Sequence, residues 1–236
     1  MTPTPPPLAL FDLDHTLLSG DSDVLWCEFL IRHGLAPAAQ RARNAEMDAG
    51  YRSGHIDVAT YCDFYAALLA GHGPDFWAPW CERFLAEDVL PRIPDDARAL
   101  LARHRAAGHR LVLSTATNRA ITERTARALG FADLIATDLA LDGGRYTGRT
   151  AGAPNMREGK VARLHAWLAD QGLGPEARAA ALRSAHFYSD SANDLPLLQA
   201  VGLPVAVDPD ARLLQAAADR AWPVLRLRRG TAQGAR

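Results

Sequence analysis

The chain has 236 residues, a hydrophobic fraction of 48% and a formal net charge of -1. This length and apolar content suit a globular fold with a sizeable core and argue against disorder. Because a charge this close to zero provides no basic surface for nucleic acid or for an acidic membrane, we expect neither as a partner.

Residues 1–7 are rich in proline and lack the basic and apolar segments of a secretory signal, and no apolar run is long enough to cross a bilayer. The three cysteines, Cys27, Cys62 and Cys81, are odd in number and widely spaced. This spacing favours reduced packing cysteines over a disulfide framework or a zinc site. Together these features predict a soluble cytoplasmic protein. The basic segment Arg226–Arg236 is interpreted as a solvated tail.

The first predicted element is a short buried strand that begins at Leu8 and runs into Asp12, Asp14 and Thr16. Two carboxylates one residue apart repel each other unless a cation or a proton relieves them. The pair therefore predicts a metal site, an acid with a raised pKa, or both. A simpler alternative is that Asp14 or Thr16 only caps the helix that follows.

Residues 21–89 have the apolar spacing of helices and contain no intervening strand. Asp21 and Ser22 can cap the first of these helices. Three of the five tryptophans of the chain lie in this segment. We therefore predict a bundle of about four helices with its own aromatic core, to which Trp77 and Trp80 contribute.

From residue 91 onward, predicted strands and helices alternate. Apolar runs near residues 110–114, 131–137, 186–189 and 203–207 predict strands, and residues 158–171 predict a helix. Residues 139–146 contain Asp-Gly-Gly, which is typical of a β-hairpin turn. This alternation predicts an α/β fold with a Rossmann-like parallel sheet covered on both faces, whose ligands bind at the carboxyl ends of the strands.

A group of hydroxyl residues, Ser114, Thr115 and Thr117, ends the second predicted strand. Thr115 is expected where the strand stops and a helix begins. Hydroxyl groups and free backbone N–H groups at such a point form a cradle for an anion. The pattern does not decide which of the three faces the anion, and helix capping is the alternative role.

Two later segments add charged side chains at the starts of helices. Lys160 follows Gly159 at the start of a predicted helix, where an ammonium could neutralise a carboxylate and an incoming phosphate together. Asp190 ends a predicted strand, and Asp194 follows four residues later. This second acidic pair predicts one direct magnesium ligand and one residue that binds the metal or its water.

In this order the four segments resemble the motifs of the haloacid dehalogenase-like (HAD) phosphohydrolases. Asp12 and Asp14 match the family's Asp-x-Asp-x-Thr/Val motif, and Thr115-Ala116-Thr117 matches its Ser/Thr motif. Lys160 matches the family lysine, and Asp190 with Asp194 matches the last acidic motif, although Tyr188-Ser189 replaces the usual residues before it. The helical insert between the first two motifs is similar to the cap of the phosphoserine phosphatase-like subgroup, subfamily IB.

The resemblance implies a HAD-like core domain over residues 1–18 and 91–236, and a cap domain over residues 19–90 that closes over the site. It implies that Asp12 attacks phosphorus and that Asp14 acts as acid and then base. It further implies phosphate-binding and metal roles. The phosphate would be bound by Thr115, Ala116 and Lys160, and Mg²⁺ by Asp12, the backbone carbonyl of Asp14, Asp190 and Asp194.

These motifs predict a magnesium-dependent phosphatase that hydrolyses a small-molecule phosphate monoester through an aspartyl-phosphate. In the subgroup, an acidic residue shortly after the first motif contacts the substrate's ammonium group, and Asp21 stands at the matching offset. Helix capping by Asp21 is an equal alternative. A substrate contact would favour phosphoserine or histidinol phosphate, but no arginine for the carboxylate of phosphoserine is identified in residues 47–56.

A phosphoacceptor signalling domain that acts by binding partners is the competing function, because it also combines acidic residues, a hydroxyl and a lysine on a parallel sheet. Such domains have no large helical insert, which argues against this alternative. The sequence identifies neither the physiological substrate nor the oligomeric state.

Overall fold

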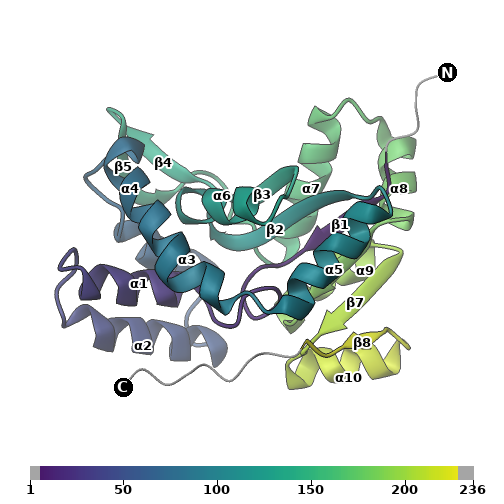
Figure 1. Ribbon diagram of the computed structural model, residues 1–236, viewed down its shortest axis with the longest axis horizontal. Coiled ribbons are helices and arrows are strands. Elements are labelled where there is room, and N and C mark those ends of the chain that lie inside the picture. Colours follow the sequence, from purple (N-terminus) through teal and green to yellow (C-terminus); the bar gives the residue numbers. More distant parts are fainter. Residues whose placement is uncertain (1–5, 228–236) are drawn as a thin grey trace.

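The computed structural model describes residues 6–227 and has a six-stranded parallel sheet at its centre (Figure 1). The strand order is β3-β2-β1-β6-β7-β8. This architecture confirms the predicted α/β fold with a parallel sheet. The strands are β1 Leu8–Phe11, β2 Arg110–Asn118, β3 Asp133–Thr137, β6 His186–Ser189, β7 Leu203–Val207 and β8 Val224–Leu225.

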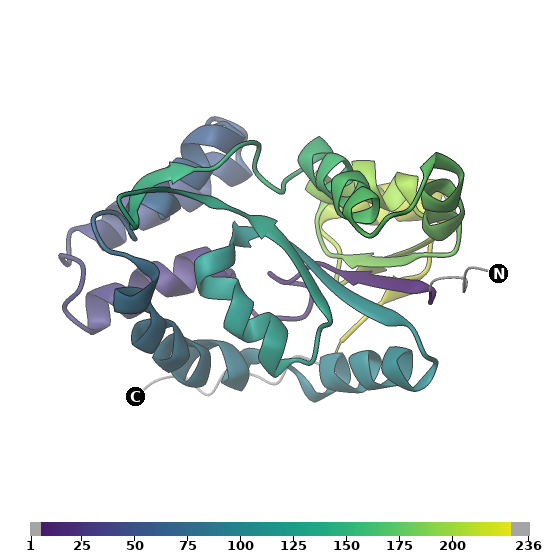
Figure 2. The same cartoon turned by 90° about the horizontal axis from the view of Figure 1, so that it is seen from above.

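Helices cover both faces of this sheet (Figure 2). Successive side chains of β1 point to opposite faces, so Ala9 and Phe11 pack into one buried cluster and Leu8 and Leu10 into another. The first cluster lies under α5 (Asp95–Ala106) and α6 (Arg119–Ala128). The second lies under α7 (Glu158–Asp170), α8 (Pro175–Arg183), α9 (Leu195–Ala200) and α10 (Ala211–Asp219). A strand buried on both faces explains why β1 is a continuous apolar run.

Four helices lie between β1 and α5, as the apolar spacing predicts. They are α1 Ser22–Arg32, α2 Gln40–Arg52, α3 Val58–Ala67 and α4 Pro74–Phe84, followed by a π-helical turn, Leu85–Val89, and a 3-10 turn, Leu90–Arg92. The predicted hairpin is present as β4 (Leu139–Asp142) and β5 (Arg145–Thr150), and it packs on α3. The backbone N–H of Gly71 donates to the carbonyl of Tyr146 at 2.9 Å. The division into core and cap domains stays a proposal.

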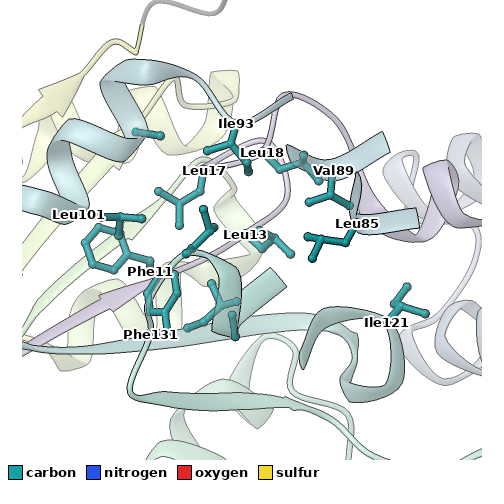
Figure 3. Packing of buried hydrophobic residues seen from close by; sticks show 14 of the residues in the cluster. Phe11, Leu13, Leu17, Leu18, Leu85, Val89, Ile93, Leu101, Ile121 and Phe131 are labelled. Carbon is teal, nitrogen blue, oxygen red and sulfur yellow. The ribbon is translucent and has the colours of Figure 1, made fainter. Parts of the chain in front are cut away.

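The tryptophans of the insert do not form a core separate from the sheet, which corrects that part of the prediction, although Tyr61 and Tyr65 belong to a smaller cluster within the insert. Trp26 of α1 and Trp77 of α4 belong to the same buried cluster as Phe11 and Leu13, and Trp80 is only partly buried against it. Figure 3 shows this cluster passing from Phe11 and Leu13 toward Leu85. A rigid movement of the whole insert would therefore have to break a shared core.

The second strand is longer than the sequence suggests. β2 continues to Asn118, whose side chain caps α6 by accepting from the N–H of Ile121 at 3.3 Å. Its pairing with β3 is irregular between Ser114 and Asn118. Thr115 therefore lies inside the strand and not at the start of the helix, because the β-branched threonines keep the chain extended through the irregularity.

Cys27, Cys62 and Cys81 are buried free thiols, as predicted. Within the described residues, no helix combines the length and apolarity needed to span a membrane. Most of the basic tail, residues 228–236, lies outside the described residues.

Candidate active site

The first and fourth motifs meet at the carboxyl ends of neighbouring strands. Asp12 directly follows β1, and Asp190 directly follows β6, which pairs with β1 in parallel. The chain order reverses here, since β2 lies on one side of β1 and β6 on the other. Open parallel sheets bind ligands at such a reversal. A cavity of about 400 Å³ lies there, and its lining includes Asp12, Asp14, Ala116, Lys160, Asp190 and Asp194.

Lys160 connects the first acidic motif to the last one. Its side chain is 2% exposed, and Nζ donates to Asp12 Oδ1 at 2.7 Å and to Asp194 Oδ2 at 2.6 Å. Burial alone would lower the pKa of Lys160, but the two carboxylates outweigh it and raise the pKa above its ordinary value. The buried ammonium therefore stays charged.

The residue before this lysine must be glycine. A Cβ at Gly159 would lie 2.2 Å from the backbone oxygen of Pro154. This agrees with the close backbone approach expected at Gly159, and it brings the first turn of α7 against the loop so that Lys160 reaches the strand ends.

Asp12 and Asp190 share a hydroxyl neighbour. Thr16 Oγ1 lies 3.1 Å from Asp12 Oδ2 and 3.0 Å from Asp190 Oδ1, and it accepts from the N–H of Asp190 at 3.0 Å. Burial, and then the charge of Asp12, raise the pKa of Asp190 well above its ordinary value. A cation between these groups would relieve that repulsion. The atoms that could bind such a cation are all oxygens, which are the ligands that Mg²⁺ prefers.

Asp194 is held by two hydrogen-bond donors on the sheet side of the site. Its Oδ2 accepts from both Lys160 and the hydroxyl of Ser189, the latter at 2.7 Å. Burial raises the pKa of Asp194, while Lys160 opposes that rise. The carboxylate thus positions Lys160, and its proposed metal role remains a prediction.

Asp14 is held by the insert and by β2. Its Oδ1 accepts from the N–H of Ser22 at 2.7 Å, and its Oδ2 accepts from the hydroxyl of Thr117 at 2.8 Å. Burial, followed by the charges of Asp21 and Asp12, raises the pKa of Asp14 to about 8. Both side-chain oxygens have protein donors, which is consistent with a metal role for the backbone carbonyl only.

The hydroxyl motif is divided between two sides of β2. Ala116 and Thr117 line the cavity, whereas Thr115 is fully buried and does not. The hydroxyl of Thr115 accepts from the N–H of Thr117 at 3.2 Å. Phosphate binding by Thr115 stays a prediction, and Thr117 has a role that the motif did not reveal, since it orients Asp14.

Asn155 is a further residue that the sequence analysis missed. It is fully buried, and its Nδ2 donates to the carbonyls of Thr115 and Ile135, both at 2.9 Å. It therefore fixes the ends of β2 and β3 to the loop before α7. A single asparagine in an Ala-Pro-Asn loop gives no sequence signal for this role.

Asp21 has both of the arrangements that the sequence left open. Its Oδ1 caps α1 by accepting from the N–H groups of Asp23 at 2.9 Å and Val24 at 3.0 Å. Its Oδ2 lies 3.4 Å from the hydroxyl of Tyr61, and the residue lines the cavity. Burial raises the pKa of Asp21. Capping is confirmed, and it leaves Oδ2 on the cavity side of the helix terminus.

Two tyrosines and a further aspartate of the insert form the rest of that wall. The rings of Tyr51 and Tyr61 lie 4.3 Å apart between centroids, and the hydroxyl of Tyr51 donates to Met156 Sδ at 3.0 Å. Asp48, one helical turn before Tyr51, also lines the cavity. The sequence analysis missed these residues because polar and aromatic positions on a surface helix are ordinary.

The walls of the cavity carry an excess of negative charge. Nine aspartates line it, while Lys160 is the one lysine or arginine among the described residues that do so. Six of these aspartates lie on the core side, where Lys160 offsets part of the charge, and Asp21, Asp23 and Asp48 lie on the insert side. A divalent cation and a positively charged group of a ligand would both offset the excess.

A family model for haloacid dehalogenase-like hydrolases matches residues 9–199. The chain belongs to this family. A histidinol-phosphatase from Neisseria meningitidis is 39% identical to this phosphatase over 220 residues, which cover 92% of this chain and 97% of the relative. The family assignment and this relative identify an enzyme, so the signalling alternative is set aside.

Solved structures agree with this assignment. A Bordetella pertussis protein of unknown function has a crystal structure with 44% sequence identity and a TM-score of 0.86, covering 94% of this chain and 99% of that one. A phosphoserine phosphatase, solved as an analogue of its phospho-aspartyl intermediate, has a TM-score of 0.67 and 15% identity, covering 95% and 94%. The second likeness shows the fold alone, which is that of the phosphoserine phosphatase-like subgroup.

Proposed function

We propose that this phosphatase hydrolyses a small amino-alcohol phosphate, with histidinol phosphate as the leading candidate, in a magnesium-dependent reaction. The observation that carries the proposal is the contrast within one cavity. Its sheet side has the Asp12–Lys160 pair, which suits a phosphate. Its insert side has acidic and aromatic groups, and no arginine lines the cavity among the described residues.

The proposed reaction begins with in-line attack of Asp12 on phosphorus, which gives an aspartyl-phosphate and releases the alcohol. Lys160 offsets the charge of Asp12 and of the phosphate oxygens as the two anions approach. Mg²⁺, held by Asp12, Asp190 and the backbone carbonyl of Asp14, would supply further charge neutralisation when bound. Backbone N–H groups near Ala116 would donate hydrogen bonds to the remaining phosphate oxygens.

Asp14 is proposed as the acid that protonates the leaving alcohol, and then as the base that activates the hydrolytic water. Its carboxyl lies two residues beyond the nucleophile, and Thr117 and the N–H of Ser22 fix its orientation. Because Ser22 is the first residue of α1, correct placement of the insert also positions the acid.

Charge complementarity favours histidinol phosphate over phosphoserine. Histidinol phosphate has an ammonium group and an imidazole but no carboxylate. Asp21 and Asp48 suit the cation, and the faces of Tyr51 and Tyr61 suit a flat ring. Phosphoserine would bring a carboxylate toward these aspartates, with no described arginine lining the cavity to receive it. Arg157 contacts the ring of Tyr51 and the side chain of Asn193 but does not line the cavity.

The relatives support the same proposal. The Neisseria meningitidis relative is named for histidinol phosphate and matches along nearly its whole length. The phosphoserine phosphatase that shares the fold was trapped as a phospho-aspartyl analogue, which supports a covalent step at Asp12. The cytoplasmic location expected from the sequence stays a prediction.

The test compares kcat/KM for histidinol phosphate, its deaminated analogue and phosphoserine in three proteins: wild type, Asp21→Asn and Asp21→Ala. Asparagine caps a helix about as well as aspartate, so the Asn variant removes the charge and keeps the cap. We expect wild type to prefer histidinol phosphate and both variants to lose the preference for the amine. Equal use of the amine and its deaminated analogue by wild type would overturn the proposal. Retention of the preference in Asp21→Asn would show that Asp21 is only a cap.

A further inference from the structure

Three histidines from separate segments meet near the amino-terminal ends of the strands, which is the end of the sheet opposite the active site. His104 lies on α5, His109 precedes β2, and His186 is the first residue of β6. Since a strand rises about 3.3 Å per residue, His186 is separated from Asp190 by roughly 13 Å along β6. This cluster is therefore distinct from the catalytic carboxylates.

The arrangement of the three rings suits a single metal ion. One ligand nitrogen from each histidine lies within 4.8 Å of the other two. The ring centroids are 4.9 Å apart for His104 and His109, 4.9 Å for His104 and His186, and 5.3 Å for His109 and His186. Imidazoles bound at their usual distance around a tetrahedral ion have ring centres roughly 5 Å apart. Only small side-chain adjustments would bring the nitrogens onto one ion.

The hydrogen bonds of the cluster involve the ring nitrogens of His104 and His109. His104 Nε2 lies 2.7 Å from the hydroxyl of Tyr188, and its Nδ1 lies 2.7 Å from Nδ1 of His109. The first contact fixes the ring of His104 in the way that outer partners orient metal-binding histidines. In the second contact two nitrogens share one proton, which a bound cation would displace to solvent. His186 Nδ1 is buried and has no hydrogen-bond partner.

The protonation state also suits metal binding, because a metal requires neutral imidazole. Burial, with the neighbouring histidines, lowers the pKa of His104 to about 4, and burial also lowers the pKa of His186. A second cavity, of about 480 Å³, is lined by His186 and Tyr188. It would give water access to a fourth coordination position.

We propose that His104, His109 and His186 bind one divalent transition-metal ion of the Zn²⁺ type, at a site separate from the catalytic Mg²⁺ site. Imidazole nitrogen suits Zn²⁺, Co²⁺, Ni²⁺ and Cu²⁺, whereas Mg²⁺ prefers oxygen. The ion would join α5, the α5–β2 loop and β6, and would act by stabilising the fold and not in the hydrolysis.

The experiment uses the full-length chain without an affinity tag, stripped of metal and then kept in excess Mg²⁺ so that the catalytic carboxylates are occupied. Co²⁺ is titrated as the probe, and its visible absorption reports nitrogen ligands in a tetrahedral site. Wild type should show one equivalent of such Co²⁺, which Zn²⁺ displaces, and its thermal midpoint should rise with either ion. His109→Gln and His186→Gln should lose the signal and the shift while retaining phosphatase activity.

His55→Gln is the matched control, since this histidine is exposed on the insert, far along the chain from the cluster. It should behave as wild type. Absence of the Co²⁺ spectrum in folded, active wild type would overturn the proposal. Retention of the spectrum in both His109→Gln and His186→Gln, or its loss in Asp190→Asn, would place the metal elsewhere and overturn it as well.

Discussion

The two walls of the active-site cavity are built in different ways. On the sheet wall, Asp12 and Asp190 leave strand ends that hydrogen bonding fixes in register, and Lys160 is buried between carboxylates. On the insert wall, Asp48 and Tyr51 lie on α2 and Tyr61 lies on α3. The two tyrosines pack in a small cluster that is separate from the two larger ones. In the proposed function, the first wall binds the phosphate and the second wall contacts the alcohol part of the substrate.

The two sides of the insert pack against different clusters, so substitutions in them should have different effects. The α1 and α4 side shares the aromatic core that also holds Phe11, the residue before Asp12. The α2 and α3 side packs mainly through Tyr61, Tyr65 and the cysteines Cys27 and Cys62. Changes on the sheet wall should therefore reduce turnover with every substrate, whereas changes on the α2 and α3 side should alter the choice among substrates.

The largest expected effect is at the nucleophile. Asp12→Asn should reduce kcat by about 10⁴-fold or more for histidinol phosphate and for a generic aryl phosphate alike, because loss of a covalent nucleophile removes the reaction path. Steady-state phosphate release measures this. Glu176→Gln, at an exposed position on α8, is the control and should behave as wild type. Appreciable Mg²⁺-dependent turnover in Asp12→Asn would contradict the assignment of the nucleophile.

Lys160→Met should reduce both turnover and stability. Removing the cation leaves Asp12 and Asp194 buried without their common partner, and breaking a buried ion pair costs about 3–5 kcal/mol. Denaturant unfolding measures this cost, and kcat should fall about 10²-fold or more through lost charge stabilisation. Added Mg²⁺ should restore part of the stability, since it neutralises Asp12. A fully stable and active Lys160→Met protein would show that the ion pairs of Lys160 contribute to neither stability nor turnover.

The main residues of the sheet wall could be predicted from the sequence because they lie just after an apolar strand or at the start of a helix. Asp12, Asp14, Lys160 and Asp190 were all located in this way, as were the parallel sheet and the four inserted helices. The residues of the insert wall could not be predicted, because Tyr51 and Asp48 have the ordinary spacing of a surface helix. Their role depends on the packing of α2 against α3, which no local pattern encodes.

Two further differences have physical causes of the same kind. Thr115 was expected at a helix start, but the irregular pairing of β2 with β3 extends the strand to Asn118 and brings Thr117 to the cavity instead. The tryptophans were expected in a core separate from the sheet, but Trp26 and Trp77 are buried in the cluster that also holds Phe11 and Leu13.

Stability should depend on pH through His104, which packs against β6 near the end of the sheet opposite the active site. The unfolded imidazole titrates near its ordinary pKa of 6.5, and the folded one at about 4. Between these values the unfolded chain binds the extra proton, so stability is present above about pH 6.5 and falls as the pH drops toward 4. The loss should reach about 3 kcal/mol, measured by denaturant unfolding in chelated buffer. His104→Gln should flatten this dependence, and an unchanged slope would assign it to other groups.

The smallest effect should distinguish the ring of Tyr51 from its hydroxyl. Tyr51→Phe loses the hydrogen bond to Met156 Sδ and should change kcat/KM for histidinol phosphate by less than about threefold. Tyr51→Ala loses the ring and should raise KM by about tenfold while leaving kcat for a small aryl phosphate near wild type. If Tyr51→Ala reduced kcat for every substrate equally, the division of labour between the two walls would be wrong.

Trapping the covalent step tests the role of Asp12 directly. Wild-type enzyme turning over histidinol phosphate with Mg²⁺ is quenched in acid, reduced with borohydride, and analysed by peptide mass spectrometry. We expect that Asp12 alone is phosphorylated and is converted to homoserine by the reduction, and that chelation of Mg²⁺ or the Asp12→Asn change abolishes the label. Labelling of a different residue during full turnover would contradict this expectation.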